Sequence, residues 1–448
     1  MAWRRSDTAR VVGAASFGLA AACSWSRFDD IEENPPVELL EQPDELRFGF
    51  GNSVTVASEG ENVVGLVTGI APFSRGASFQ LGQSENTATA SSDRNYCTSG
   101  GDEVCALASS PAGLGRAWSP DGEKRLCFAL GLGAVGGDSG VVLRCDGGAE
   151  SALPVPEGVA VPTQAPQVAI DKGVPIPDSV LAVDRDEAPS LLASSPSQAR
   201  AWKYEPLSKV PEELVPPQEV SAGYGRTLAV ARVNGARVYA VGDPDAGSVW
   251  LFRGAAGKPA APLGCLSSPG LGRSLAAGAV DEADGDELLL TDDAGVLVLS
   301  GAALASAAPA KGVPCGADWL PAKAWLGAIG CEEVAQGAGC VRTEFGAALA
   351  VADLDGDGSG EVIVGAPNLD VRGESGAGAV FVYDFREGEP VLVDTRILSS
   401  VDSGDRLGAS IAVAPQRTRE VLLVGAPGRN AAVVLYCNAL ASSGSRCR

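Results

Sequence analysis

Acidic residues alternate with other residues in the nine-residue segment 353–361, which reads DLDGDGSGE. Carboxylates stand at its first, third, fifth and ninth positions, and Gly358 permits a sharp turn that directs the backbone carbonyl of the seventh residue inward. An irregular cage of hard oxygen ligands suits Ca²⁺ better than Mg²⁺, which prefers a regular octahedron. We therefore predict a calcium site with these ligands: Asp353, Asp355, Asp357, Ser359 and Glu361. The alternative is an acidic turn exposed to solvent.

The segments that flank this loop decide which kind of calcium site it can form. Apolar, strand-like runs precede it at 347–351 and follow it at 362–364. An EF-hand needs flanking helices and a Glu at the twelfth loop position, where this chain has Val364. We therefore expect a strand–loop–strand site in which the ion is structural, because it joins the loop and offsets the repulsion among its carboxylates.

One order of elements recurs along the chain: an aromatic residue or Leu before Gly, then a short apolar strand, a polar loop and further short strands. The marker positions of these repeats are Gly51, Gly115, Ser179, Gly225, Gly272, Gly346 and Gly408. Periods of roughly 45 to 75 residues with three or four short strands each are typical of propeller blades, which bury their faces by packing around an axis. The predicted fold class is all-β, a β-propeller of seven blades with one calcium-binding blade loop.

Two features give these repeats a family resemblance. Phe-Gly at 345–346 is followed, after the acidic loop, by Gly-Ala-Pro at 365–367, and Gly-Ala-Pro recurs at 425–427. This pattern resembles the FG-GAP repeat of integrin α-subunit propellers and their bacterial relatives, over roughly Phe48 to Tyr436. The resemblance implies the same strand–loop–strand calcium site. In the preceding repeat, Ala279 and Ala283 stand where the first and fifth ligands would be, so we expect a single intact site.

Two short motifs invite enzymatic interpretations. Gly-Asp-Ser-Gly at 137–140 looks like the nucleophile segment of trypsin-like proteases, but the chain contains no histidine to serve as the base. The segment 131–136 fits GxGxxG, yet a turn and a strand-like run follow it, not the helix whose N-terminus binds phosphate. We therefore expect no enzymatic activity.

The charge of the chain limits its partners. The formal net charge is −22 at pH 7, which repels a nucleic-acid backbone and favours metal cations. We expect no nucleic-acid partner.

The N-terminal segment 1–47 differs from the repeats. Residues 1–22 combine arginines with an apolar run too short to span a bilayer, and they end in Leu-Ala-Ala-Ala before Cys23. This resembles a bacterial lipobox, which implies a signal peptide, a lipidated Cys23 and an anchor in the membrane, with the outer membrane as the expected one. The alternative is an ordinary cleaved signal peptide. Residues 23–47 then form an acidic tether, whose part near 37–40 can instead supply a closing strand, and residues 48–448 form the propeller.

Ten cysteines remain once Cys23 is set aside as the lipid site. An even number in an exported chain suggests disulfides, whose connectivity the sequence does not determine. Pairing close neighbours gives Cys97 with Cys105, Cys127 with Cys145, Cys331 with Cys340, and Cys437 with Cys447. Cys265 and Cys315 then remain as the fifth pair. Zinc is the competing interpretation, disfavoured because the chain has no CxxC pair.

These features predict a non-enzymatic calcium-binding propeller, exported to the cell envelope and exposed at the cell surface or in the periplasm. Its expected role is that of a binding or adhesion scaffold whose protein or glycan ligand docks on the loop face. Two alternatives stay open: a structural envelope component without a discrete ligand, and a hydrolase that uses paired carboxylates.

Overall fold

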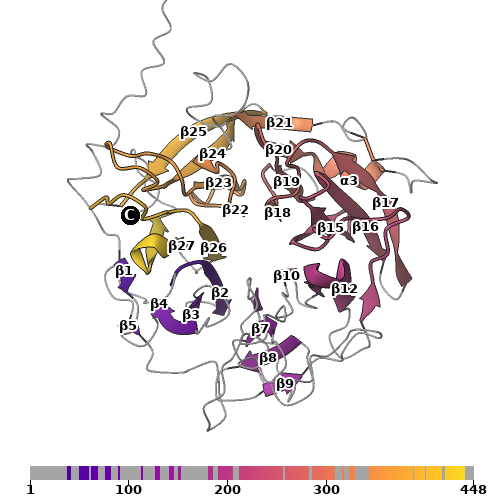
Figure 1. Ribbon diagram of the computed structural model, residues 1–448, viewed down its shortest axis with the longest axis horizontal. Helices are drawn as coiled ribbons and strands as arrows, with labels where there is room; N and C mark the ends of the chain where they lie inside the picture. The colour runs from indigo at the N-terminus through magenta and orange to yellow at the C-terminus, as the bar shows by residue number, and fades with distance from the viewer. Residues whose placement is uncertain are drawn as a thin grey trace, which may run out of the picture.

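The structure, a computed structural model, describes these residues: 38–41, 50–59, 62–68, 76–81, 89–90, 112–114, 127–131, 141–145, 150–152, 180–184, 190–204, 211–255, 258–281, 285–307, 315–316, 322–327, 343–386, 388–398, 400–415 and 419–438. Their strands form seven four-stranded sheets that stand around a common centre (Figure 1). Neighbouring strands within every sheet are antiparallel, as expected where short strands alternate with Gly-rich and polar turns.

The first three sheets come from the N-terminal half of the chain. Sheet 1 comprises β2 (Ser53–Glu59), β3 (Asn62–Thr68), β4 (Gly76–Leu81) and β5 (Thr89–Ala90). Sheet 2 comprises β6 (Ala112–Leu114), β7 (Cys127–Gly131), β8 (Val141–Cys145) and β9 (Glu150–Ala152). Sheet 3 comprises β10 (Val180–Asp184), β11 (Ser190–Ser195), β12 (Arg200–Tyr204) and β13 (Glu212–Glu213), with a 3₁₀ turn at Pro196–Gln198.

The other four sheets follow in the same way. Sheet 4 comprises β14 (Thr227–Val233), β15 (Ala236–Asp243), β16 (Ser248–Ala255) and β17 (Lys258–Ser267). Sheet 5 comprises β18 (Leu275–Gly278), β19 (Glu287–Thr291), β20 (Gly295–Leu299) and β21 (Ala322–Gly327), and the short helix α3 (Gly301–Ser306) precedes β21. Sheet 6 comprises β22 (Leu349–Ala352), β23 (Glu361–Ala366), β24 (Ala379–Arg386) and β25 (Glu389–Arg396). Sheet 7 comprises β26 (Ser410–Pro415), β27 (Arg419–Ala426), β28 (Ala431–Asn438) and the N-terminal strand β1 (Glu38–Glu41), with a 3₁₀ turn at Pro427–Arg429.

The ring is closed at sheet 7, where the two ends of the described chain meet. The first strand of each sheet contacts the first strand of the next, and β26 contacts β2 to complete the circuit. Strand β1 pairs antiparallel with β28, with Leu40 opposite Ala432. The closing-strand alternative for residues 37–40 is therefore confirmed for Glu38–Glu41, while Cys23 and most of the proposed tether lie outside the described residues.

The marker glycines hold adjacent sheets together. Five of the seven predicted markers are described, and all five adopt φ between +85° and +94°, a region that only glycine enters at low cost: Gly51, Gly225, Gly272, Gly346 and Gly408. Three of these five, Gly225, Gly272 and Gly346, donate the N–H within their own sheet and accept a hydrogen bond at the carbonyl from a hydroxyl of the preceding sheet. For Gly346 the partners are Gly365 O at 2.9 Å and Thr291 Oγ1 at 2.7 Å.

The marker glycines bear on the prediction of seven blades, because each of them marks one predicted repeat. The repeat signature is seen in five sheets, and the markers Gly115 and Ser179 of the other two repeats lie outside the described residues. The same device spans the seam, where Ser410 Oγ donates to Gly51 O at 2.9 Å across 359 residues of sequence.

Apolar cores lie between neighbouring sheets. Phe345 and Phe381, for instance, pack with ring centroids 5.7 Å apart within a core shared by sheets 5 and 6. Strand β23 is buried along its whole length, which explains its run of apolar residues. Burying each such Val, Leu or Phe side chain contributes about 1.5–3 kcal/mol, so the shared cores, in place of a single central one, stabilise the ring.

The cysteines can be followed in part. Cys265 and Cys315 form a disulfide, as predicted. Cys127 and Cys145 face each other across β7 and β8 in the strand register. The remaining predicted pairs each include a cysteine outside the described residues: Cys97, Cys105, Cys331, Cys340 and Cys447.

The two enzyme-like motifs fall around one connection. Strand β7 ends at Gly131, and β8 begins at Val141 and pairs with it antiparallel. Residues 132–140, which hold nearly all of both motifs, lie outside the described residues. The strands on either side of them are antiparallel neighbours, whereas a dinucleotide-binding βαβ unit has parallel strands. Within the described residues, no helix has the length and the apolar character needed to cross a membrane.

Candidate metal site in sheet 6

The predicted calcium loop joins β22 to β23. The two strands pair up to the loop itself, with Ala352 opposite Glu361. The β-branched run that follows Glu361 favours the strand β23, whereas the Gly-rich and Asp-rich stretch before it favours a tight turn. The first carboxylate, Asp353, thus follows the end of β22 directly, and the last, Glu361, begins the neighbouring strand β23.

Asp353 organises the backbone of the loop. Its Oδ1 accepts hydrogen bonds from the N–H groups of Gly356 at 2.6 Å and Asp357 at 3.1 Å, and its Oδ2 accepts from Gly358 at 3.0 Å. The turn depends on positive φ values of +76° at Gly356 and +96° at Gly358. One carboxylate therefore gathers three successive backbone donors and holds the loop in a closed form.

Glu361 anchors the loop from below. Its side chain is 1% exposed, and its Oε2 accepts a hydrogen bond from Leu354 N at 2.7 Å. Leu354 is fully buried and belongs to the core between sheets 6 and 7. The carboxylate is therefore positioned by packed residues and is turned toward the loop.

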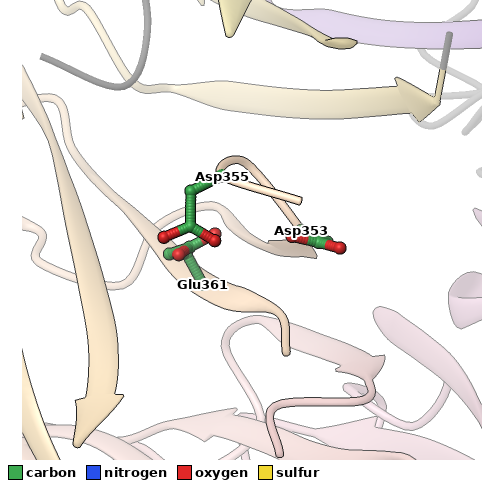
Figure 2. A group of neighbouring side chains, drawn as sticks. All are labelled: Asp353, Asp355 and Glu361. Atoms are coloured by element: carbon green, nitrogen blue, oxygen red, sulfur yellow. The ribbon is translucent and has the colours of Figure 1, made fainter. Parts of the chain in front are cut away.

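Three carboxylates converge at this point. Asp353 and Asp355 from the loop and Glu361 from β23 place one oxygen each within 4.8 Å of one another (Figure 2). Three negative charges at such distances repel one another by a few kcal/mol per pair at an effective dielectric constant of about 20. A hard divalent cation between them would turn this repulsion into attraction, so the donor set fits Ca²⁺.

The predicted ligands are thus brought together only in part. Asp357 is exposed and is not one of the three converging residues; its Oδ1 accepts from Ser359 N at 2.8 Å. Ser359 is half-buried, and its carbonyl as a ligand stays a prediction. Asp357, the fifth residue of the loop, therefore stabilises the conformation of the loop in this structure. The carboxylates of the first, third and ninth residues form the cluster.

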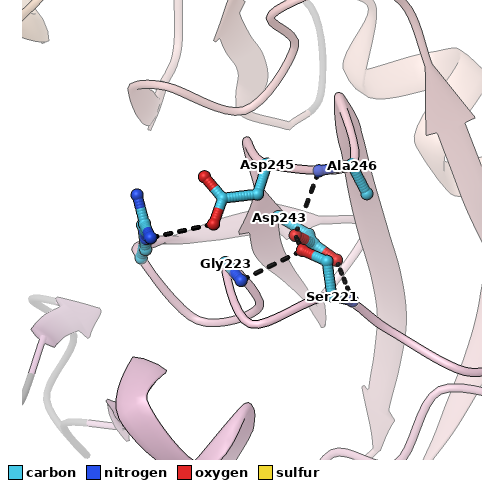
Figure 3. Close-up of polar contacts among 6 residues, drawn as sticks. Ser221, Gly223, Asp243, Asp245 and Ala246 are labelled. Atoms are coloured by element: carbon cyan, nitrogen blue, oxygen red, sulfur yellow. Dashed lines mark hydrogen bonds and ion pairs between the residues drawn. The ribbon is translucent and has the colours of Figure 1, made fainter.

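A second acidic cluster in sheet 4 was not singled out by the sequence. Asp243 is fully buried, and its carboxylate accepts from Ser221 N at 2.9 Å, from the Ser221 hydroxyl and from Ala246 N at 3.4 Å (Figure 3). Nearby, Asp245 forms an exposed ion pair with Arg226 at 2.8 Å. These bonds join the segment before β14 to the turn after β15, so Asp243 has a structural role there.

The aromatic marker of the same sheet is buried beside this cluster. The Tyr224 hydroxyl donates to Leu214 O at 2.8 Å. Burial, reinforced by the charges of Glu213 and Asp243, raises the pKa of Tyr224 well above its usual value, so this hydroxyl stays protonated and is held as a hydrogen-bond donor.

A closed ring of antiparallel sheets that share cores between neighbours defines a β-propeller. Residues 345–383, which contain β22, the carboxylate cluster and β23, match the FG-GAP repeat family. The protein is therefore a β-propeller that contains an FG-GAP repeat in sheet 6. No curated protein matches the chain.

Proposed function

We propose that the protein is a non-enzymatic, calcium-binding propeller that acts as a binding scaffold in the cell envelope. The observation that carries the proposal is the convergence of Asp353, Asp355 and Glu361 inside the segment that matches the FG-GAP repeat. The ion is structural: it joins the loop to β23, and the charges of the three carboxylates hold it.

The scaffold role rests on the architecture. We propose that all seven sheets are blades of one propeller, whose interlocked marker glycines keep the frame rigid while the loops between strands vary. A rigid frame lowers the entropic cost of binding at its loops, which is how such folds present binding surfaces. The expected ligand is a protein or a glycan that docks on the loop face.

The location is proposed from the sequence of the N-terminal segment together with one disulfide. A signal peptide at 1–22 and a lipid on Cys23 would anchor the protein in the membrane of the envelope, the outer membrane being the expected one. The Cys265–Cys315 disulfide supports an oxidising compartment, since such bonds rarely persist in the cytosol.

Thermal unfolding of the purified protein tests the calcium site directly. A ligand bound only by the folded state raises its stability by about 2.7–4.1 kcal/mol at 100 to 1,000 times the dissociation constant. We expect calcium to raise the melting temperature relative to a chelator, and Asp355→Asn to abolish this rise. A melting temperature that does not respond to calcium would overturn the proposed site.

Asp245→Asn is the matched control for this experiment. It removes a carboxylate from an exposed turn of another sheet, where Asp245 forms an ion pair with Arg226. The variant should retain the full calcium response. Loss of the response in both variants would point to general screening of the acidic surface instead of a defined site.

A further inference from the structure

The loop between β18 and β19 in sheet 5 has the same construction as the loop in sheet 6. Gly278 is opposite Glu287 at its ends, as Ala352 is opposite Glu361. Glu287 is 1% exposed, and its Oε2 accepts from Val280 N at 3.0 Å, just as Glu361 accepts from Leu354 N. Both donors lie seven residues before the glutamate. The two loops can therefore be compared position by position.

This comparison shows which carboxylates sheet 5 retains. Asp281 occupies the position of Asp355, and Glu287 that of Glu361. Alanine stands in place of Asp353, at Ala279. Two of the three members of the cluster are thus kept, and the one that gathers the backbone donors in sheet 6 is replaced.

A lysine ammonium lies between the two retained carboxylates. Lys323, on β21 of the same sheet, forms an ion pair with Asp281, and its Nζ is 3.2 Å from Glu287 Oε1. The same Nζ lies 5.7 Å from the centre of the Phe385 ring on β24 of sheet 6. The Lys323 side chain is only 15% exposed, so the ammonium is enclosed by anions on one side and by an aromatic face on the other.

We propose that Lys323 is a tethered substitute for a divalent cation, which closes the sheet 5 loop without an ion and keeps calcium out of it. The inference is that one positive charge leaves the two retained carboxylates with a net charge of −1, which is the same net charge that a divalent ion leaves on three converging carboxylates. The replacement of Asp353 by Ala279 and of Asp357 by Ala283 agrees with this role, because a lysine needs fewer oxygen partners than calcium does.

The locked loop also supports its neighbour. Gly360 N, in the sheet 6 loop, donates to Ala279 O in the sheet 5 loop at 2.9 Å. If Lys323 holds the sheet 5 loop in one conformation, Ala279 O is a fixed hydrogen-bond acceptor for the candidate metal loop. Of these two loops, only that of sheet 6 would then respond to calcium, while Ala279 of sheet 5 would keep its position when the ion leaves.

The experiment counts the calcium ions bound by the full-length protein and its variants in equilibrium dialysis. Ala279→Asp/Ala283→Asp restores the missing acids but leaves Lys323 in place, and a triple variant adds Lys323→Met. We expect the double variant to bind no more calcium than the unaltered protein and the triple variant to bind one more ion. An equal count in the triple variant, or an extra ion in the double variant, would overturn the proposal.

The comparison uses the difference from the unaltered protein, so it does not depend on whether the sheet 6 loop itself binds calcium. If the triple variant does not fold, Lys323→Met alone provides the test. Its matched control is Lys203→Met, which removes a buried lysine that pairs with Glu212 at 3.1 Å and lies 5.7 Å from the Tyr239 ring centre in another part of the ring.

We expect calcium to raise the melting temperature of Lys323→Met by more than it raises that of Lys203→Met, because only the first variant exposes a pair of loop carboxylates. Equal responses of the two variants would contradict the substitution of a cation by Lys323.

Discussion

The loops of sheets 5 and 6 start from one backbone plan and differ in how their carboxylates are balanced. In both, a buried glutamate at the start of the second strand accepts a hydrogen bond from a buried apolar residue of the loop. Sheet 5 then brings in Lys323 from its outermost strand, whereas sheet 6 adds a third carboxylate within the loop itself. The glutamate is therefore an anchor in either case, and the residues around it decide whether the loop attracts an ion.

The largest effect is expected at the anchors themselves. Glu287→Gln breaks a buried ion pair and should lower the free energy of unfolding by about 3 kcal/mol, equally with calcium and with a chelator. Glu361→Gln should lower the free energy of unfolding by less than this in chelator, because the loss of one charge relieves the repulsion within the cluster. Its loss of stability should be larger in calcium than in chelator. Urea unfolding under both conditions measures the two variants. A calcium-dependent loss in Glu287→Gln would erase the distinction between the loops.

A smaller effect is expected where the two loops touch. A Cβ at Gly360 would collide with the carbonyl oxygen of Ala279, so Gly360→Ala must push the loops apart and weaken the hydrogen bond between them. We expect a loss of about 2 kcal/mol. Gly327→Ala is the control, since a Cβ there meets nothing within 4 Å. Equal stabilities of these two variants, measured by urea unfolding, would show that the loops are independent.

The turn within the sheet 6 loop should respond still less. Gly358 has φ of +96° with open space around its Cβ position, so Gly358→Ala adds conformational strain without a clash. The expected loss is about 1 kcal/mol, together with weaker calcium binding because the loop closes less well. Isothermal titration with calcium and urea unfolding provide the two readings. If the variant were as stable as the unaltered protein, the conformation at position 358 would not require glycine.

The smallest effect on stability distinguishes the three converging carboxylates from the five ligands that the sequence predicted. Asp357 is exposed and lies outside the carboxylate cluster, so Asp357→Asn should change stability by less than about 0.5 kcal/mol and should largely preserve calcium affinity. Asp353→Asn should abolish the response, since Asp353 both belongs to the cluster and gathers the loop backbone. If Asp357→Asn also abolished the response to calcium, Asp357 would have to be counted among the ligands, as the sequence predicted.

Local patterns predicted much of this molecule. The buried strand β23 follows from its β-branched run, the turn from Gly358, and the start of five repeats from the marker glycines, because each depends on residues close together in the chain. The disulfide between Cys265 and Cys315 was also predicted, from an even cysteine count and as the pair that remained once close neighbours were paired.

Distant partners were the part that local patterns missed. Lys323 lies 36 residues from Glu287 in the sequence, in a segment without any motif, and only the pairing of β21 with β20 brings it to the loop. Asp243 was missed for a related reason: it stands where the FG-GAP pattern has an alanine, and its partner Ser221 is 22 residues away. The exposure of Asp357 depends on how the loop closes, which spacing alone does not define.

Strand β1 has a consequence for the order in which the molecule folds. Most strands pair with neighbours that are close in the chain and can form as hairpins, but β1 must wait for β28, and Ser410 must wait for Gly51 across 359 residues. Closing such a long loop is entropically unfavourable until the sheets between are formed, so the seam is expected to assemble last. Until then β28 presents an open edge to any other extended chain, which makes the interval before closure the time when the chain is most exposed to aggregation.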